Sequence, residues 1–409
     1  MSSRRPDLVV IGAGVVGLAV ARAWVIRHPG HRVVVLEKEP APGRHASGRN
    51  SGVLHAGFYY EPGSMKARFT REGNRQWQEF CSERGVRIRK TGKLLLATRP
   101  RNLEAFPLLL LRAHENGVPL REVSREEARE IQPRVQGQER ALYSPETATL
   151  DPAEAVAGLV RDAKDRGVVI ETGIGVTGVQ KRRIRLSDGR RIEPGFIVNA
   201  AGLQADRVAR WFGFSPDHRI LPFRGNYLLS SNDQNPVRTC VYPVPDLARP
   251  FLGVHLTAGV DGREKIGPSA RPALWREQYG GLRGFRPRET AEIGWRQLRL
   301  LVRNDFGFRS LARAALREGR HRMMVDRAAD LISGVSPAHY TQWGRPGIRA
   351  QLVDIRKSRL ETDFRIEGDE HSLHILNAVS PGFTCAFPFA DYLVRRMESG
   401  TAGADGSRP

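Results

Sequence analysis

Residues 7–39, DLVVIGAGVVGLAVARAWVIRHPGHRVVVLEKE, decide the fold of this chain. The apolar run over 7–11 is typical of a strand buried in a parallel sheet. Gly12, Gly14 and Gly17 follow in the pattern GxGxxG. In this pattern the first glycine makes the turn, the second lets the backbone approach a pyrophosphate, and the third lets a helix pack on the strand. The stretch therefore predicts a strand, a glycine turn and a helix whose N-terminus binds a pyrophosphate.

A second strand follows, and it ends in an acid. The stretch RVVVLE, residues 32–37, is again a short apolar run, and Glu37 closes it 20 residues after Gly17. An acidic side chain at that place accepts hydrogen bonds from both ribose hydroxyls and repels a 2′-phosphate. We therefore expect a dinucleotide site of the Rossmann type. Its predicted residues here are Gly12, Gly14, Val15, Val16, Gly17, Glu37 and Lys38.

The glycine pattern occurs a second time, in ETGIGVTG at 171–178, with Gly173, Gly175 and Gly178. Residues 179–193, VQKRRIRLSDGRRIE, follow it, and they alternate and break at a Ser-Asp-Gly turn, which predicts a hairpin. A hairpin offers no helix N-terminus to a phosphate, so we interpret this second pattern as a decoy. The chain is expected to bind one dinucleotide and to lack a separate NAD(P) domain.

Two further segments repeat the order of strand, small residues and helix. FIVNAAGLQADRVARWFG at 196–213 places Ala200 and Gly202 at the end of a strand. SLHILNAVSPGFTCAFPFADYLV at 372–394 places Pro381 and Gly382 before an apolar helix. Small residues at a strand end suit the close passage of a ligand, and a helix N-terminus opened by Pro and Gly suits an anion or a carbonyl oxygen.

Length and cysteine content restrict the class of protein. A chain of 409 residues favours two domains. Its three cysteines, Cys81, Cys240 and Cys385, are far apart and show no CxxC spacing. This argues against a disulfide scaffold and against a metal site, and it is typical of a reducing, cytoplasmic compartment.

The formal net charge of +21 is carried by arginine, densest over residues 282–322. Such a region can bind nucleic acid or an anionic membrane surface, supply cations for an anionic substrate, or form solvated helix faces. No aromatic platform or nucleic-acid motif accompanies the charge, so no nucleic-acid partner is expected. Peripheral contact with the inner face of a membrane stays open.

Six stretches carry a family resemblance, and they span nearly the whole chain in order. They are NSGVLHAGFYYEPGSMKARF (50–69), PFRGNYLLS (222–230), YPVPD (242–246), PFLGVHLT (250–257), GPSA (267–270) and GIRAQ (347–351). The chain resembles the D-amino-acid-oxidase-like flavoproteins, and among them the L-2-hydroxyglutarate dehydrogenases/oxidases. It departs from the typical member at LVDIRKSRLETDF (352–364) and in NAVSPGFTCAF (377–387).

The resemblance implies an α/β two-domain flavoprotein, in which a Rossmann-type FAD-binding domain interleaves with a mixed-sheet substrate domain. The FAD-binding domain is predicted at 1–80, 150–214 and 345–409. The substrate domain is predicted at 81–149 and 215–344, with an Arg-rich helical insertion near 275–330, and a disordered tail is expected from residue 399.

The resemblance also places the stretch SGRNSGVLHAGFYY, residues 47–60, beneath the flavin ring. Its small residues would then be bare backbone against the cofactor. Together with the segments described above, this loop extends the list of predicted FAD contacts. The added residues are Ser47, Arg49, Asn50, Ser51, Gly52, Val176, Ala200, Gly202, Pro381 and Gly382.

The implied reaction is the oxidation of an L-2-hydroxy acid, with L-2-hydroxyglutarate giving 2-oxoglutarate as hydride leaves Cα for flavin N5. A neutral imidazole suits removal of the hydroxyl proton, and His55 is the first candidate base, with His255 as its competitor. Either histidine can also be a hydrogen-bonded structural residue. Arg349 aligns with the residue that grips the substrate carboxylate in two-point fashion in amino-acid-oxidising relatives. The predicted partners of the second carboxylate are Tyr60, Lys66, Arg224 and Tyr242.

Two other functions stay open from the sequence. An amine or amino-acid oxidase has the same fold, although an ammonium substrate favours an acidic or aromatic lining over added cations. A basic nucleic-acid- or membrane-binding flavoprotein belongs to another class. The electron acceptor, whether oxygen, a quinone or a carrier protein, has no signal in the sequence.

Overall fold

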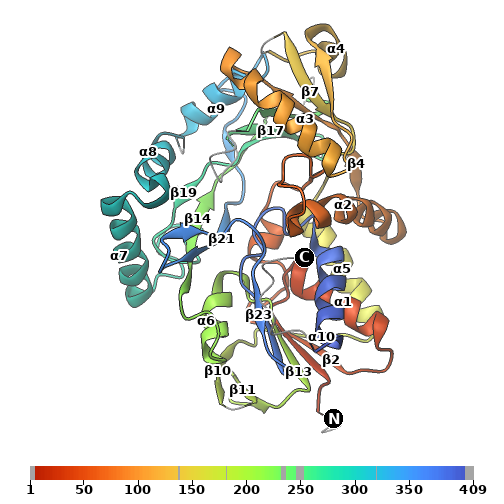
Figure 1. The fold of residues 1–409 in the computed structure, drawn as a ribbon, viewed down its shortest axis with the longest axis vertical. Coiled ribbons are helices and arrows are strands. Elements are labelled where there is room, and N and C mark those ends of the chain that lie inside the picture. The colour runs from red at the N-terminus through yellow and green to blue at the C-terminus, as the bar shows by residue number, and fades with distance from the viewer. Residues whose placement is uncertain are drawn as a thin grey trace.

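The structure is a computed structural model that describes residues 5–136, 139–180, 182–231, 236–245, 253–318 and 320–400 (Figure 1). Residues 401–409, most of the predicted tail, lie outside the described residues, as do residues 246 and 250–252 of two stretches that carry the resemblance.

A parallel sheet forms around the segment that opens the chain. Its strands, in spatial order, are β23 (Ile366–Gly368), β24 (Ser372–Ile375), β13 (Phe196–Asn199), β1 (Leu8–Ile11), β2 (Val33–Glu37) and β9 (Val169–Thr172). Only β23 pairs antiparallel with its neighbour; β24, β13, β1, β2 and β9 pair in parallel. Strands from both ends of the chain thus belong to one sheet, with β13 between them, and both predicted apolar runs, at 7–11 and 32–37, are strands of this sheet.

Both faces of this sheet are covered, which explains why β1 and β2 are apolar throughout. Leu8 and Val10 pack with α1 (Val15–Arg27), α2 (Met65–Arg84), α5 (Pro152–Asp165) and α10 (Ala386–Glu398). Val9 and Ile11 point to the other face, where they pack with α6 (Ala205–Trp211) and with a small antiparallel sheet. Successive residues of one strand therefore serve two separate cores.

The small antiparallel sheet contains the second glycine pattern. It consists of β10 (Val176–Gln180), β11 (Arg183–Leu186) and β12 (Arg191–Ile192). β10 begins directly after Gly175, where a phosphate-binding loop requires a helix. The predicted hairpin is confirmed, so the second glycine pattern leads into a strand and offers no helix N-terminus to a phosphate.

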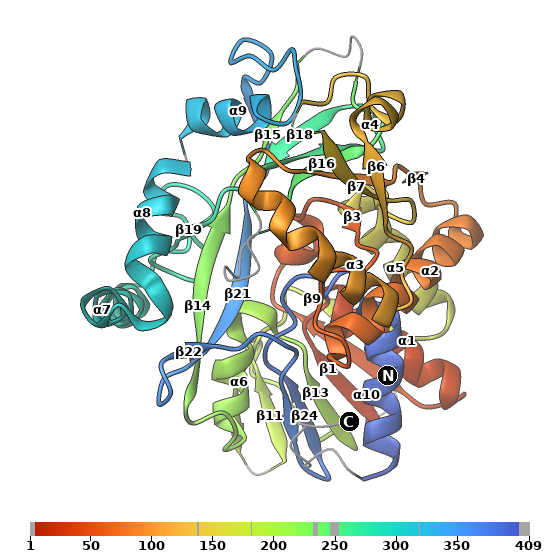
Figure 2. The ribbon, with the colours of Figure 1, turned by 45° about the horizontal axis from the view of Figure 1, so that its top comes forward.

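A mixed sheet lies at the other end of the molecule (Figures 1 and 2). Its order is β20 (Gln342–Trp343), β15 (Leu228–Leu229), β18 (Glu264–Gly267), β17 (His255–Ala258), β16 (Cys240–Pro243), β5 (Lys93–Leu96), β7 (Arg140–Ser144) and β6 (Arg121–Ser124). β16 and β5 pair in parallel, whereas the other described pairs are antiparallel. The mixed α/β fold class is confirmed; the domain boundaries stay a prediction.

Two smaller sheets connect these regions. One contains β19 (Arg271–Pro272), β14 (His218–Gly225), β21 (Gly347–Asp354) and β22 (Arg359–Leu360), and the other contains β3 (Val53–Leu54), β8 (Ala148–Leu150) and β4 (Ile88–Lys90). The remaining helices are α3 (Phe106–Glu115), α4 (Arg125–Ile131), α7 (Pro287–Arg303), α8 (Phe308–Glu318) and α9 (His321–Ala329). Short 3₁₀ turns span Ala46–Gly48, Pro100–Ala105, Gly202–Gln204 and Asp305–Gly307. In both views α7, α8 and α9, which hold the Arg-rich sequence, follow one another along one outer side.

Candidate active site

The first glycine loop has the geometry that a phosphate cradle needs. Gly12 has a positive φ of 107°, and a Cβ there would lie 2.6 Å from the carbonyl oxygen of Ala200. A Cβ on Gly17 would lie 2.1 Å from the Gly12 oxygen, so this glycine lets α1 approach β1. Gly14 is the N-cap of α1, and its missing side chain leaves backbone exposed beside Ser47. The start of α1, where Gly14, Val15 and Val16 line an open space, therefore presents the positive end of the helix dipole to it.

Glu37 lies at the end of β2 and is 7% exposed. Its Oε2 accepts a hydrogen bond from Ala13 N at 2.9 Å, and its Oε1 accepts one from Glu39 N at 2.9 Å. These bonds fix the carboxylate beside the glycine loop. Each carboxylate oxygen keeps a further lone pair for a ribose hydroxyl.

The loop at 47–52 is organised by its own side chains. Ser47 Oγ accepts a hydrogen bond from Val15 N at 2.9 Å, at the N-terminus of α1. Asn50 Nδ2 donates to Ser47 O at 2.9 Å, and Asn50 Oδ1 accepts from Gly52 N at 2.8 Å. A Cβ on Gly52 would lie 2.1 Å from the Leu150 oxygen, so bulk at this position is excluded. The loop is thereby held against the start of α1.

One cavity of about 1040 Å³ extends from the glycine loop to both candidate bases. Its volume is at the upper end of the range for ligand sites, which suits a dinucleotide together with a small substrate. The sequence-predicted residues that line it are Gly12, Gly14, Val15, Val16, Glu37, Lys38, Ser47, Arg49, Asn50, Ser51, His55, Tyr60, Lys66, Val176, Ala200, Gly202, Tyr242, His255, Arg349, Pro381 and Gly382. Gly17 and Gly52 lie behind the wall, where they allow close packing.

Arg224 is not among the residues that line the cavity. On β14 and β21, Phe223 pairs with Arg349 and Arg224 pairs with Ile348. Paired residues share a face and successive residues alternate, so Arg224 and Arg349 point to opposite faces. The Arg224 guanidinium donates to Asn226 Oδ1 at 3.1 Å instead.

Pro381 and Gly382 also differ from the expected position. α10 begins at Ala386, and Cys385 is its N-cap. Residues 380–385 form turns in which Gly382 N donates to Val379 O at 2.8 Å and Cys385 N donates to Pro381 O at 3.1 Å. Pro381 and Gly382 therefore line the cavity from the turn that precedes α10, and they are not part of the N-terminus of that helix.

His55 follows β3 and is 7% exposed. Its backbone N donates to Thr384 Oγ1 at 3.2 Å, and its Nδ1 lies 3.3 Å from Lys93 Nζ. Burial, the charge of Lys93 and the neighbouring His255 together hold the pKa of His55 well below its usual range. The imidazole is therefore neutral at neutral pH.

His255 lies on β17 and stacks on Tyr242, with 3.7 Å between ring centroids. Its Nδ1 lies 3.0 Å from the Gly253 oxygen, and a carbonyl only accepts, so Nδ1 carries the proton. Its Nε2 is buried and has no hydrogen-bond partner within the described part of the chain. Burial lowers the pKa of His255 to about 3, which makes it a second neutral imidazole.

The cations and phenols of the predicted substrate region, Arg349, Lys66, Tyr60 and Tyr242, all line this cavity. Burial lowers the pKa of the Arg349 guanidinium, and Tyr227 opposes that shift. Burial likewise lowers the pKa of Lys66, partly offset by Asp363. The hydroxyls of Tyr59 and Tyr60 are 2.9 Å apart. This end of the cavity can therefore bind an anion through charge and hydroxyl donors together.

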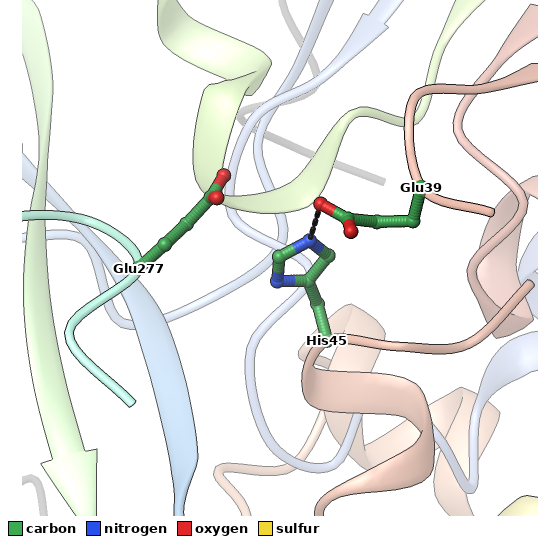
Figure 3. A group of neighbouring side chains, drawn as sticks. All are labelled: Glu39, His45 and Glu277. Carbon is green, nitrogen blue, oxygen red and sulfur yellow. Dashed lines mark hydrogen bonds and ion pairs between the residues drawn. The ribbon is translucent and has the colours of Figure 1, made fainter. Parts of the chain in front are cut away.

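Lys38, a predicted cofactor contact, also joins two parts of the chain. Its Nζ contacts Glu39 and lies 3.0 Å from Glu277 Oε1. Burial lowers its pKa, but these carboxylates outweigh that effect and raise it. Figure 3 shows Glu39, His45 and Glu277 pointing toward one another, with His45 Nε2 3.1 Å from Glu39 Oε1. This trio has the spacing of metal ligands, and the Lys38 ammonium already balances its carboxylates.

Sequence reasoning missed several residues of this site. Lys93, Tyr227 and Thr384 contact or neighbour the candidate catalytic residues. Lys93 alone gave a signal, because GKLLLAT, residues 92–98, places one lysine at the start of an otherwise apolar strand. Tyr227 and Thr384 reach the site only through strand pairing and chain packing.

Comparisons with known proteins agree with this geometry. Residues 7–396 match the protein family described as FAD dependent oxidoreductase. The chain is 33% identical over 402 residues to an L-2-hydroxyglutarate dehydrogenase of Escherichia coli K12, covering 96% of this chain and 93% of that protein. It is 32% identical over 426 residues to the human mitochondrial L-2-hydroxyglutarate dehydrogenase, covering 96% and 89%.

Solved structures show the same fold at lower identity. The L-α-glycerophosphate oxidase from Mycoplasma pneumoniae, with FAD bound, superposes with a TM-score of 0.76 at 21% identity, covering 97% of this chain and 95% of that one. Glycine oxidase from Geobacillus kaustophilus gives a TM-score of 0.71 at 17% identity, covering 99% and 96%. Within the described residues, no helix is long and apolar enough to cross a membrane.

Proposed function

The chain belongs to the FAD dependent oxidoreductase family, and from that premise we propose that it oxidises an L-2-hydroxy acid, with L-2-hydroxyglutarate as the substrate and 2-oxoglutarate as the product. One observation carries this proposal. A single cavity joins the dinucleotide cradle to His55, His255 and Arg349. Relatives called L-2-hydroxyglutarate dehydrogenase, aligned over nearly the whole chain, support the choice of substrate.

The cradle fits FAD on its own geometry. Gly14 leaves backbone open at the start of α1, and Glu37 offers carboxylate oxygens beside it. Bound FAD supplies the two-electron acceptor for the hydride that leaves Cα of the substrate. The residues proposed to hold it are the cavity-lining positions of the glycine loop, of 47–51, and Glu37, Lys38, Val176, Ala200, Gly202, Pro381 and Gly382, while Gly17 and Gly52 make room for them.

The other end of the cavity fits a dicarboxylate. Arg349 is proposed to hold the carboxylate next to the reacting carbon, because a guanidinium matches a carboxylate at two points. Lys66 and the hydroxyls of Tyr60 and Tyr242 are proposed to bind the second carboxylate; all three line the cavity. Arg224 drops out of the proposal because it points to the other face of its sheet. A neutral imidazole, from His55 or His255, takes the hydroxyl proton.

An amine or amino-acid oxidase is the second candidate, since Asp363 and Glu61 also line the cavity. Asp363 is already engaged by the backbone N–H groups of Met65 and Lys66. The side chain of Glu61 is 81% exposed. These acids are therefore poorly placed to hold an ammonium group in the interior, which favours the hydroxy acid.

The experiment is anaerobic reduction of the enzyme-bound flavin by a panel of substrates, followed as bleaching of its visible absorbance. We expect L-2-hydroxyglutarate to bleach the flavin, and D-2-hydroxyglutarate, L-glutamate and simple amines to leave it oxidised. Fast bleaching by an amino acid with none by either hydroxy acid would overturn the proposal in favour of the second candidate.

We further propose a cytoplasmic protein that contacts an anionic membrane surface peripherally and passes electrons to a quinone there. α7 exposes large apolar side chains among its arginines, including Trp295 at 68% and Val302 at 64% exposure. A helix with basic and apolar residues on one outer face is typical of interfacial binding. A nucleic-acid partner stays the alternative use of this charge.

A further inference from the structure

Lys93 is a buried cation directly behind the active-site wall. It is the first residue of β5 and is 0% exposed. Its Nζ lies 3.3 Å from His55 Nδ1, 4.4 Å from the ring centroid of Tyr242 and 5.5 Å from that of Phe58. It does not itself line the cavity. Any effect of Lys93 on a bound molecule therefore passes through His55 or through its charge.

Among the described residues no carboxylate forms an ion pair with Lys93. A buried ammonium without one is costly, and chains rarely keep such a group for stability alone. Burial lowers the pKa of Lys93 to about 8, so it is mostly charged at neutral pH. The aromatic faces of Tyr242 and Phe58 and the imidazole of His55 are the groups that stabilise this charge.

The contact with Lys93 decides where His55 carries its proton. An ammonium only donates, so His55 Nδ1 must accept from it. A neutral imidazole has one N–H, which then lies on Nε2. His55 therefore offers a bound molecule a hydrogen-bond donor and holds no lone pair for a second proton there.

His255 has the opposite arrangement. Its Nδ1–H donates to the Gly253 carbonyl, so Nε2 carries the lone pair. That atom is buried without a hydrogen-bond partner in the described residues, and His255 lines the cavity. The charged groups that act on it are Lys93 and Arg349, and both keep it neutral. A bound dicarboxylate brings two negative charges, which shift the pKa of His255 back upward and strengthen it as a base.

We propose that Lys93 is a positioning residue that fixes His55 as an Nε2–H donor and so leaves His255 Nε2 as the base of the reaction. This rests on the proposed oxidation of a 2-hydroxy acid. The substrate O–H bond breaks and its proton goes to His255 Nε2, while the Cα–H bond breaks and its hydride reduces the bound flavin. The carbon–oxygen double bond of the 2-oxo acid forms, and His55 Nε2–H donates to that oxygen.

The first test reads the tautomers without any substrate. Two-bond ¹H–¹⁵N correlation spectra of the ¹⁵N-histidine-labelled holoenzyme distinguish Nδ1–H from Nε2–H imidazoles, and His55→Gln and His255→Gln assign the two signals. We expect His55 as Nε2–H and His255 as Nδ1–H at pH 7. Lys93→Met should release His55 from its tautomer. Lys265→Met is the matched control, because Lys265 lies on β18 of the same sheet and does not line the cavity.

The second test is stopped-flow reduction of the flavin by L-2-hydroxyglutarate. His255→Gln should slow the reduction step by roughly 10²- to 10⁴-fold, the range for a general base. His55→Gln should slow it by roughly 10-fold, the effect of one lost hydrogen bond. In Lys93→Met the acid limb of the pH–rate profile should move to higher pH, because the charge that holds the pKa of His255 down is gone. A purely structural Lys93 would leave that limb in place.

Three results would overturn the inference: an Nδ1–H tautomer for His55 in the wild type, equal tautomers in wild type and Lys93→Met, or a larger loss of rate in His55→Gln than in His255→Gln. Each differs from failure of the proposed function, in which no hydroxy acid reduces the flavin although the tautomers are as expected. Lys93→Met keeps an unbranched apolar chain in a buried site, so it should fold, and flavin content and thermal melting check that it does.

Discussion

Arg276 and Asp206 form a two-point ion pair that is almost completely buried. Arg276 Nη1 lies 2.6 Å from Asp206 Oδ1, and Nη2 lies 2.9 Å from Oδ2. The side chains are 1% and 0% exposed. Asp206 belongs to α6, under the parallel sheet, whereas Arg276 precedes the Arg-rich helices. Glu289 in the first turn of α7 accepts from Arg276 N at 2.7 Å. This network therefore fastens the Arg-rich region to the nucleotide-binding part of the fold.

Removing Arg276 should destabilise the whole protein. Arg276→Met leaves Asp206 charged and buried, and we expect the free energy of unfolding to fall by about 3 kcal/mol, as for other broken buried pairs. Urea unfolding followed by circular dichroism measures this. The control is Arg75→Met on α2, because Arg75 pairs with Glu72 and Glu79 but is 59% exposed. Its loss of stability should be much smaller, because solvent screens an exposed ion pair, and equal losses in the two variants would contradict the expectation.

The same pair predicts an acid-sensitive contribution to stability. Burial raises the pKa of Asp206, but the charge and hydrogen bonds of Arg276 outweigh it and lower that pKa from 3.8 to about 2. A carboxyl group whose pKa is lower in the folded chain stabilises the fold at pH values above its unfolded pKa. This stabilisation is lost as the pH falls through its folded pKa. The contribution is about 2 kcal/mol above pH 5, and roughly half is gone by pH 3.

Asp206→Asn isolates this contribution. The difference in unfolding free energy between wild type and Asp206→Asn should shrink between pH 5 and pH 3, measured by urea unfolding at each pH. A difference that stays constant across that window would mean that Asp206 titrates alike in the folded and unfolded chains.

The choice between the two glycine loops can be tested on cofactor content. Gly14→Val places a branched side chain where the backbone of α1 is open, and its Cβ would already lie 3.1 Å from Ser47 Oγ. We expect this variant to purify without FAD. Gly175→Val is the comparison: Gly175 also lines the cavity, but a Cβ there would meet Lys38 Cβ at an ordinary 3.5 Å. Absorbance at the flavin maximum per protein measures both, and full flavin in Gly14→Val with loss in Gly175→Val would reverse the assignment.

Arg349→Lys should chiefly weaken substrate binding. Lysine keeps the charge but loses the planar fork, and a charged hydrogen bond lost in this way raises KM by roughly 10-fold or more. Arg224→Lys is the matched control from the neighbouring strand, because its side chain lies on the opposite face. Steady-state kinetics with L-2-hydroxyglutarate separates KM from kcat. A large loss of kcat at saturating substrate in Arg349→Lys would assign Arg349 a role in the chemical step instead.

The sequence predicted the parts of the site that one continuous segment builds. Gly12, Gly14 and Glu37 belong to a strand, turn, helix and strand in direct succession, so their geometry follows from local rules. The decoy at Gly175 was recognisable for the same reason, since the residues after it alternate. In each case the information lies within about 30 residues.

The parts of the site that the sequence could not place depend on pairing between distant strands. Whether Arg224 faces the cavity depends on its register with β21, more than a hundred residues later. The proposal that His255 and not His55 is the base rests on the contact between Lys93 and His55, which brings together residues from β5 and the loop after β3. No local pattern encodes such a contact, because side chains of different strands meet only after the sheets assemble.

The Arg-rich helices allow a last prediction, about the membrane. On α7 the large exposed side chains include Trp295, Leu298 and Val302, while Ile293 and Leu300 are buried on the inner face. Arg299 and Arg303 lie on the exposed part of the same helix. Each basic residue near an anionic surface contributes about 1 kcal/mol, and salt screens it over a Debye length of about 8 Å near 0.15 M. The holoenzyme should therefore bind vesicles rich in anionic phospholipid and release as salt rises.

Trp295→Glu should abolish vesicle sedimentation and slow reduction of a membrane quinone, yet leave flavin reduction by substrate in solution unchanged, because α7 lies on the outer side of the molecule. Leu111→Glu is the control: Leu111 is an apolar residue on α3 that is 54% exposed, and charge there should leave vesicle binding intact. Binding to neutral vesicles as strong as to anionic ones would remove the electrostatic part of the proposal. Salt-sensitive binding to duplex DNA without binding to vesicles would assign the arginines to a nucleic acid, and binding to neither would leave them as a solvated surface.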